Sequence, residues 1–174
     1  NASKRNFNGS STCEQVLKGI DVTGKTIAIT GTSKSPGIET ARHLALAGAR
    51  VICLNRNKKL SGKQTVAVRN ENDKGYKNPS FEMFFIKCDL SSLASVRDAA
   101  VELMQKKEKL DVLILNAGLQ LPAVKATSDG LETTFGVNHV GHSHLTNLLL
   151  PLLKSSSPAR IVVVSSHAHL ISGV

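Results

Sequence analysis

The sequence is poor in aromatic residues and in cysteine. Its 174 residues include no tryptophan, one tyrosine and three cysteines, and aromatic residues make up 3% of the chain. Few rings are available to stack on bases, and the basic residues are dispersed, so the net charge of +9 does not indicate a nucleic-acid-binding protein. An odd number of cysteines argues against a disulfide framework and favours an intracellular, cytoplasmic location.

The sequence also lacks long hydrophobic runs. No stretch approaches the roughly 18 apolar residues that a membrane span requires, and the polar N-terminus does not resemble a signal peptide. With 41% hydrophobic residues, the chain is nevertheless rich enough in apolar side chains to form a sizeable core. We therefore expect one soluble domain over residues 21–174, preceded by a loose N-terminal arm over residues 1–20.

Short apolar runs alternate with longer helical patterns, as is typical of a parallel sheet with crossover helices. The predicted strands are Thr26–Thr30, Arg50–Leu54, Phe81–Cys88, Leu110–Leu115 and Arg160–Val164. The predicted helices are Pro36–Ala47, Lys58–Asn70, Leu93–Lys107 and Gly130–Lys154. The polar stretch 70–80 is predicted to be a loop. The pattern predicts an α/β fold with a Rossmann-like, doubly wound parallel sheet of about five strands.

A turn with two glycines follows the first predicted strand and leads into a helix. Exposed backbone amides and the helix dipole make such a turn suitable for a pyrophosphate, although an ordinary strand-to-helix turn would look similar. We expect Ser35 to cap the helix and Pro36 to occupy its first position. The turn residues assigned to cofactor binding are Gly31, Thr32, Ser33, Lys34, Ser35, Pro36 and Gly37.

Several further segments, taken with this turn, resemble one known family. The stretches 11–21, 23–25, 130–135 and 137–142 are similar to the short-chain dehydrogenase/reductase family, and more narrowly to its branch of retinol dehydrogenases and WW-domain-containing oxidoreductases. The likeness covers about residues 11–170. It implies a dinucleotide-binding domain over residues 21–174 that is C-terminally incomplete.

The loop departs from the family pattern Thr-Gly-x-x-x-Gly-x-Gly at two positions. Ser35 replaces the middle glycine, and Pro36 replaces the usual aliphatic residue. The middle glycine lets the backbone approach the pyrophosphate, and proline has no amide hydrogen to donate. We therefore expect weaker cofactor binding than the family pattern would give.

The residues after the second strand indicate which cofactor is preferred. NAD-binding folds place a carboxylate there for the ribose hydroxyls, whereas an arginine suits the additional phosphate of NADP. Here Asn55 and Arg56 follow without an acidic residue, so NADP(H) is favoured over NAD(H). The alternative is that Arg56 is an exposed loop charge. The resemblance adds further cofactor contacts at Asp89, Leu90, Asn116, Ala117 and Gly118.

The resemblance also implies a catalytic set that is half present. Ser166 matches the family's substrate-orienting serine and Asn138 its relay asparagine, but the tyrosine and lysine that should follow Ser166 are missing. Tyr76, the sole tyrosine, is followed four positions later by Ser80. Without the resemblance, Ser166 and Asn138 would be interpreted as polar groups satisfied by their own backbone.

The implied activity is NADP(H)-dependent hydride transfer to or from a carbonyl or alcohol, possible substrates being retinoids, steroids or other lipid-like molecules. We expect this chain to be inactive by itself. The alternative is a non-catalytic relative that binds a nucleotide or a protein. His139, His142 and His144 have no nearby carboxylate or cysteine, so no metal site is predicted. Self-association is expected through helix 130–154 or through the apolar edge strand 161–164.

Overall fold

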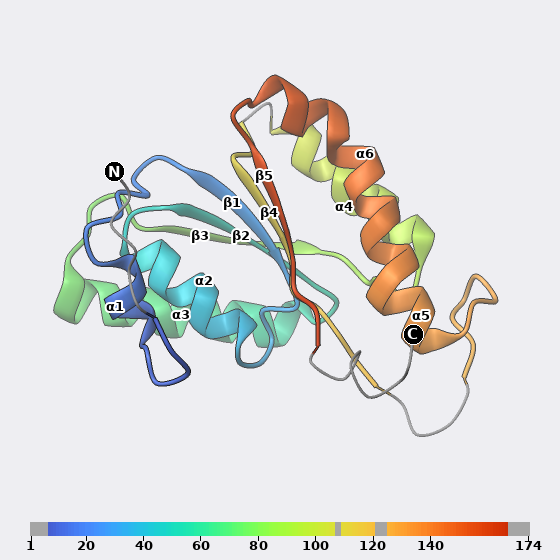
Figure 1. Cartoon of the computed structure of the whole chain (residues 1–174), viewed down its shortest axis with the longest axis horizontal. Coiled ribbons are helices and arrows are strands. Elements are labelled where there is room, and N and C mark those ends of the chain that lie inside the picture. Colours follow the sequence, from blue (N-terminus) through green and yellow to red (C-terminus); the bar gives the residue numbers. More distant parts are fainter. Residues whose placement is uncertain (1–6, 107–108, 121–124, 167–174) are drawn as a thin grey trace.

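A computed structural model describes residues 7–106, 109–120 and 125–166. Five parallel strands form one sheet in the order β3-β2-β1-β4-β5, with helices on both faces (Figure 1). This arrangement confirms the predicted doubly wound α/β fold. The strands are β1 (Thr26–Thr30), β2 (Arg50–Asn55), β3 (Glu82–Lys87), β4 (Val112–Leu115) and β5 (Arg160–Val163).

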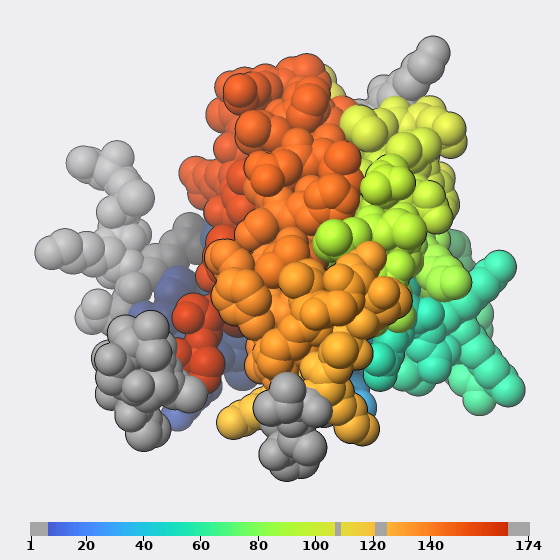
Figure 2. Space-filling model, turned by 90° about the vertical axis from the view of Figure 1, so that its right-hand side faces the viewer, coloured from blue at the N-terminus to red at the C-terminus, as the bar shows by residue number. Residues whose placement is uncertain are grey.

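The helices form a layer on each side of the sheet. In Figure 1, α2 and α3 lie on one side and α4 and α6 on the other, and Figure 2 shows α4 and α6 side by side. The helices are α1 (Cys13–Leu17), α2 (Gly37–Leu46), α3 (Lys58–Glu71), α4 (Leu93–Gln105), α5 (Thr133–Phe135) and α6 (His142–Ser155). Two π-helical turns are η1 (Asn72–Tyr76) and η2 (Gly136–Gly141).

The core has two halves, one on each face of the sheet. Ala28 of β1 packs with the α4 and α6 side, whereas Ile27 and Ile29 pack with the α2 side. Leu145 and Leu149 of α6 are completely buried against the sheet. Burial of a leucine stabilises the fold by about 1.5–3 kcal/mol, so α6 is firmly attached to the sheet.

The order of the strands opens a crevice at the carboxyl edge of the sheet. From β1 the chain moves to β2 and β3 on one side, and it then returns to β4 and β5 on the other side. The connections after β1 and β4 therefore lead to opposite faces. Such a switch point is where open α/β sheets bind ligands.

In the N-terminal half, the structure adds a short helix to the predicted arm and corrects the predicted loop over residues 70–80. The arm predicted over residues 1–20 contains α1, whose first turn is closed by a capping box between Thr12 and Gln15. The segment 70–80 is not simply a loop, because α3 extends to Glu71 and η1 continues from it. Asn72 stabilises this extension, since its buried amide bonds both backbone groups of Asn78.

The expected cap of α2 and the continuous helix over residues 130–154 are also wrong. Pro36 precedes the first turn of α2, and neither its ring nor Ser35 caps the helix. The C-terminal helical segment begins only at Thr133 and is interrupted by η2. Gly141 allows close packing at that interruption, because a Cβ there would lie 2.6 Å from the carbonyl oxygen of Leu90. Lys107, the last residue predicted for the α4 helix, lies outside the described residues.

β5 forms an open edge of the sheet. Within the described part of the chain it pairs only with β4, and its apolar side chains are 42% exposed at Ile161 and 67% exposed at Val163. None of the helices in the described ranges has the length and apolar character needed to cross a membrane.

Candidate cofactor site

A cavity of about 520 Å³ opens at the carboxyl edge of the sheet. The loop after β1 lines it together with residues that follow β2, β3 and β4. Of the residues predicted to bind cofactor, those that line the cavity are Gly31, Ser33, Lys34, Ser35, Pro36, Arg56, Asp89, Leu90, Asn116, Ala117 and Gly118. Thr32 and Gly37, the other two, are buried beneath the loop.

The hydroxyl of Thr30 joins the ends of β1 and β4. Its Oγ1 accepts hydrogen bonds from the backbone N–H of Asn116 at 2.9 Å and of Ala117 at 3.0 Å. The Asn116 amide in turn donates to the carbonyl oxygens of Thr30 and Gly31, at 3.1 and 3.2 Å. The turn after β4 is therefore fixed against the start of the loop.

A second polar cluster fixes the loop from the side of β2. The side-chain carbonyl of Asn55 accepts a hydrogen bond from the Thr32 backbone N–H at 2.8 Å. The side-chain amide of Asn55 donates to the Thr32 hydroxyl at 2.7 Å and to Ser61 Oγ at 2.8 Å. Asn55 is only 3% exposed. This role of Asn55 was not predicted from the sequence, although a polar residue at the end of a buried strand was the available signal.

Two glycines let the loop pack closely. Gly31 has φ +74°, and a Cβ there would lie 2.6 Å from the Ala117 Cα. A Cβ on Gly37 would lie 2.4 Å from the carbonyl oxygen of Gly31 and 2.5 Å from the Asn116 amide nitrogen. The loop therefore packs directly on the start of α2, which brings the positive end of that helix to the cavity.

The two residues that depart from the family pattern lie on the exposed part of the loop. Ser35 and Pro36 both line the cavity and both are exposed. Pro36 has no amide hydrogen, so the turn has one donor fewer than the pattern would supply. The dipole at the start of α2 is unaffected, because it arises from the peptide groups of the whole helix.

Charged groups from two strand ends reach the same cavity. Arg56 follows β2 and is exposed. Within the described residues 7–106, 109–120 and 125–166, no ion pair joins its guanidinium to a carboxylate. The Asp89 carboxylate accepts from the backbone N–H and the hydroxyl of Ser91, at 3.0 and 2.7 Å. Burial, with a contribution from the charge of Asp89, raises the pKa of the neighbouring Cys88 thiol to about 12, so this cysteine remains an unreactive thiol.

The structure places Asn138 beside the loop that follows β4. Its side-chain carbonyl accepts from Leu119 N–H at 2.9 Å, and its amide donates to the Leu119 carbonyl oxygen at 2.8 Å. Ser166 is exposed and lies three residues after the end of β5, at the same edge of the sheet. Tyr76 is the last residue of η1, and its hydroxyl donates to the Glu14 carboxylate; it does not line the cavity.

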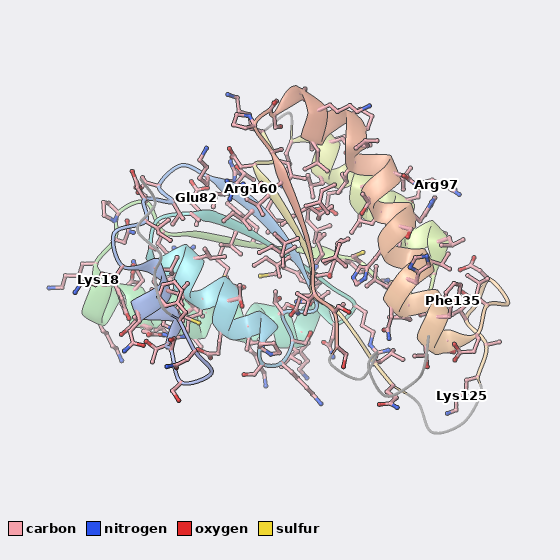
Figure 3. The ribbon with its side chains drawn as sticks, in the orientation of Figure 1. Lys18, Glu82, Arg97, Lys125, Phe135 and Arg160 are labelled. Atoms are coloured by element: carbon pink, nitrogen blue, oxygen red, sulfur yellow. The ribbon has the colours of Figure 1, made fainter. Side chains whose placement is uncertain are left out.

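From the sequence, His142 was considered only as a candidate metal ligand. In the structure it is 5% exposed, and its ring bonds Thr30 Oγ1 through Nε2 at 2.9 Å and the Asn138 carbonyl oxygen through Nδ1 at 3.0 Å. His139, which lies in η2, instead stacks on the exposed ring of Phe135, which Figure 3 labels. Among the described residues, no three histidine, cysteine or acidic side chains are grouped as metal ligands would be.

Comparison with known proteins establishes the family. The family model described as short chain dehydrogenase matches residues 25–173. The chain belongs to the short-chain dehydrogenase family. The chain is 39% identical over 166 residues to the WW domain-containing oxidoreductase of Gallus gallus, covering 95% of this chain and 39% of the relative. It is 46% identical over 151 residues to retinol dehydrogenase 14 of Homo sapiens, covering 82% of this chain and 45% of the relative.

These relatives confirm the expected branch of the family, and the chain spans less than half the length of each. Among solved structures, the RhlG/NADP active-site complex of Pseudomonas aeruginosa matches with a TM-score of 0.67 and 28% identity. That match covers 81% of this chain and 54% of the other. The family of the chain and its Rossmann fold are therefore established.

The close packing at Gly37 predicts that Gly37→Ala destabilises the fold. The added Cβ would meet backbone atoms that cannot rotate away, so we expect a loss of about 1–3 kcal/mol in the free energy of unfolding, measured in urea. The matched control is Gly62→Ala in α3, where nothing lies within 4 Å of the added carbon. That change should stabilise the fold by up to about 1 kcal/mol. Equal effects of the two substitutions would contradict this description of the loop.

The burial of His142 predicts a loss of stability in mild acid. Burial lowers the pKa of its imidazole in the fold, with a smaller contribution from the charge of His139, while the bond to Asn138 opposes the change. The unfolded chain takes up the proton at about pH 6.5, so stability is complete above that pH. The free energy of unfolding should fall by up to about 1.4 kcal/mol per pH unit as the pH drops from 6.5 towards the lower pKa that His142 has in the folded chain.

Unfolding in urea at several pH values between 7.5 and 5 measures this effect. His142→Gln, which cannot be protonated in this range, should show a shallower slope than the wild-type chain. Identical slopes would show that His142 does not titrate with folding.

Proposed function

We propose that the chain binds NADP(H) in the cavity at the carboxyl edge of the sheet. It would form the cofactor-binding part of an oxidoreductase that acts on a carbonyl or alcohol, such as a retinoid, a steroid or another lipid-like molecule. The observation that carries this proposal is that a loop fixed at Thr30 and Thr32 lines the cavity, together with Arg56 and the start of α2. The relatives named as retinol dehydrogenases support the substrate class.

The residues of the cavity fit a pyrophosphate and its two ribosyl groups. The first turn of α2 offers backbone amides and a positive dipole to an anion, and Lys34 adds a positive charge on the same loop. The turn formed by Asn116, Ala117 and Gly118 would line the side of the cofactor next to β4. When bound, the nicotinamide supplies or accepts the hydride.

Arg56 is the residue that would select NADP(H) over NAD(H). An arginine binds a phosphate through several donors at once, and it directly follows the buried end of β2. Asn55, which precedes it, is already occupied in holding Thr32 and Ser61, so it does not compete for the ribose. The NADP complex of the Pseudomonas aeruginosa relative is consistent with this choice.

These 174 residues by themselves would bind cofactor without transferring hydride. They contain no Tyr-x-x-x-Lys, and Tyr76 hydrogen-bonds Glu14 instead of lining the cavity. Ser166 would orient a substrate carbonyl. Asn138 would position the loop after β4 instead of contacting the substrate, because both polar atoms of its side chain are hydrogen-bonded to the backbone of Leu119. General acid catalysis would need a proton donor that this stretch does not provide.

A second candidate is a relative that binds a nucleotide or a protein partner without catalysis. Pro36 favours it, because the proline removes an amide donor from the turn that would hold the pyrophosphate. The two candidates differ in whether this loop binds NADPH without repair.

The role of Arg56 can be tested by calorimetric titration with NADPH and NADH. The wild-type chain should prefer NADPH, and Arg56→Ala should weaken NADPH binding by about 10- to 100-fold, which corresponds to loss of charge-assisted hydrogen bonds. Binding of NADH should change little. Arg97→Ala is the control, because Arg97 is exposed on α4 and Figure 3 shows it pointing away from the sheet.

If binding required the double change Ser35→Gly and Pro36→Ile, the non-catalytic candidate would be favoured. If both nucleotides bound equally well to the wild-type chain and to Arg56→Ala, Arg56 would have no role in selection.

We also propose that the chain self-associates through β5. The leucines of α6 are buried against the sheet, which leaves the edge strand as the better surface; its exposed residues are Ile161, Val162, Val163 and Val164. A charge on an edge strand disfavours pairing. Val163→Lys should therefore lower the sedimentation coefficient towards that of a monomer. Val101→Lys, on the exposed side of α4, should not, and a monomeric wild-type chain would refute the proposal.

A further inference from the structure

His142 connects three parts of the chain that surround the cavity. It begins α6 directly after η2, and its ring lies between the hydroxyl of Thr30 at the end of β1 and the carbonyl oxygen of Asn138. The Asn138 side chain in turn forms two hydrogen bonds with the backbone of Leu119, which lines the cavity. A continuous series of hydrogen bonds therefore runs from β1 through η2 to the loop after β4.

The π-helical turn makes the Asn138 carbonyl available to the ring. In a regular α-helix the backbone N–H of His142 would donate to that oxygen. Here the N–H of His142 bonds the carbonyl oxygen of His139 instead, and the ring Nδ1 occupies the position at Asn138. Local backbone geometry and the buried ring thus depend on each other.

The hydrogen bonds to Thr30 and to Asn138 agree on which ring nitrogen carries the proton. A hydroxyl has one donor and two acceptor positions, and Thr30 Oγ1 already accepts from the N–H groups of Asn116 and Ala117. Its own proton must therefore point to His142 Nε2, which accepts it without a hydrogen of its own. The ring is then the neutral tautomer with hydrogen on Nδ1, and this hydrogen is donated to Asn138.

We infer that His142 is a positioning residue of the cofactor site. By accepting the Thr30 hydroxyl proton, it leaves both lone pairs of Thr30 directed at the turn formed by Asn116 and Ala117, and that turn lines the cavity. Without this acceptor, the buried hydroxyl would have to turn its proton elsewhere and give up one of the two amides. The consequence for cofactor affinity rests on the proposed function, but the structural role does not.

Three substitutions separate the two hydrogen bonds of the ring. Glutamine at position 142 keeps an acceptor near the place of Nε2, asparagine keeps a donor near the place of Nδ1, and phenylalanine removes both. In NMR spectra recorded without cofactor, His142→Gln should leave the amide signals of Asn116 and Ala117 near their wild-type positions. His142→Asn and His142→Phe should shift both signals.

The tautomer supplies a readout that packing alone would not change. Two-bond ¹⁵N–¹H spectra of the wild-type chain should show His142 with hydrogen on Nδ1. Thr30→Ser should keep both this signature and the wild-type amide signals of Asn116 and Ala117. Thr30→Val preserves shape but removes the hydroxyl, so it should shift those amide signals, while the ring keeps its hydrogen on Nδ1 because the Asn138 carbonyl oxygen can only accept. The tautomer of the wild-type chain decides the matter even where a change at His142 prevents folding. Hydrogen on Nε2 in the wild-type chain, or unmoved Asn116 and Ala117 signals in His142→Asn, would overturn the inference.

Titration with NADPH then measures whether the positioning role of His142 affects cofactor affinity, as the proposed function requires. His142→Asn should weaken binding about tenfold, which is the effect of losing one buried hydrogen bond, and His142→Gln should remain within about threefold of wild type. If the wild-type chain bound no NADPH while the tautomer and amide signals behaved as expected, the positioning role would stand and the proposed function would fail. Equal losses in His142→Gln and His142→Asn would count against the positioning role.

Discussion

The buried hydroxyl of Thr30 is the interaction on which the architecture of the cavity depends. It is fully buried and uses all three of its hydrogen-bonding positions, two for the amides of Asn116 and Ala117 and one for His142. The divergence of the connections after β1 and β4 creates the crevice, but divergence alone would leave the two strand ends free to separate. The Thr30 hydroxyl and the Asn116 side-chain amide together prevent this, because each part-buried amide that Thr30 abandoned would lose its partner.

The fixed points of the loop explain why it can depart from the family pattern. Thr30 is bound to the β4 side and Thr32 to the β2 side through Asn55, and Gly37 packs on Gly31 without room for a Cβ. Ser35 and Pro36 lie outside these contacts on the exposed part of the loop. Substitution there changes the groups that a ligand meets without changing how the loop is held. The shape of the site and its donor set are therefore separable properties.

The sequence predicted the sheet well because strands buried on both faces read as uninterrupted apolar runs. The cavity could be located for a related reason, since parallel strands deliver their following residues to one edge. The roles of His142 and Asn55 could not be found in this way. The contact of His142 with Thr30 spans 112 positions and that of Asn55 with Thr32 spans 23, and neither leaves a periodic signal. The break at η2 was missed as well; it lies where Gly141 closely approaches Leu90, a tertiary contact that leaves no periodic signal.

Binding of NADP(H) in this cavity can be tested by an NADPH titration followed by ¹⁵N–¹H correlation spectra of the labelled chain. Saturable shifts are expected only at the amides of the loop 31–37, of Arg56 and of the turn 116–118. The amides around the shallow lysine-lined hollow at Lys58, Lys63 and Val66 should stay in place. Shifts concentrated at that hollow, or none at millimolar NADPH, would contradict the account.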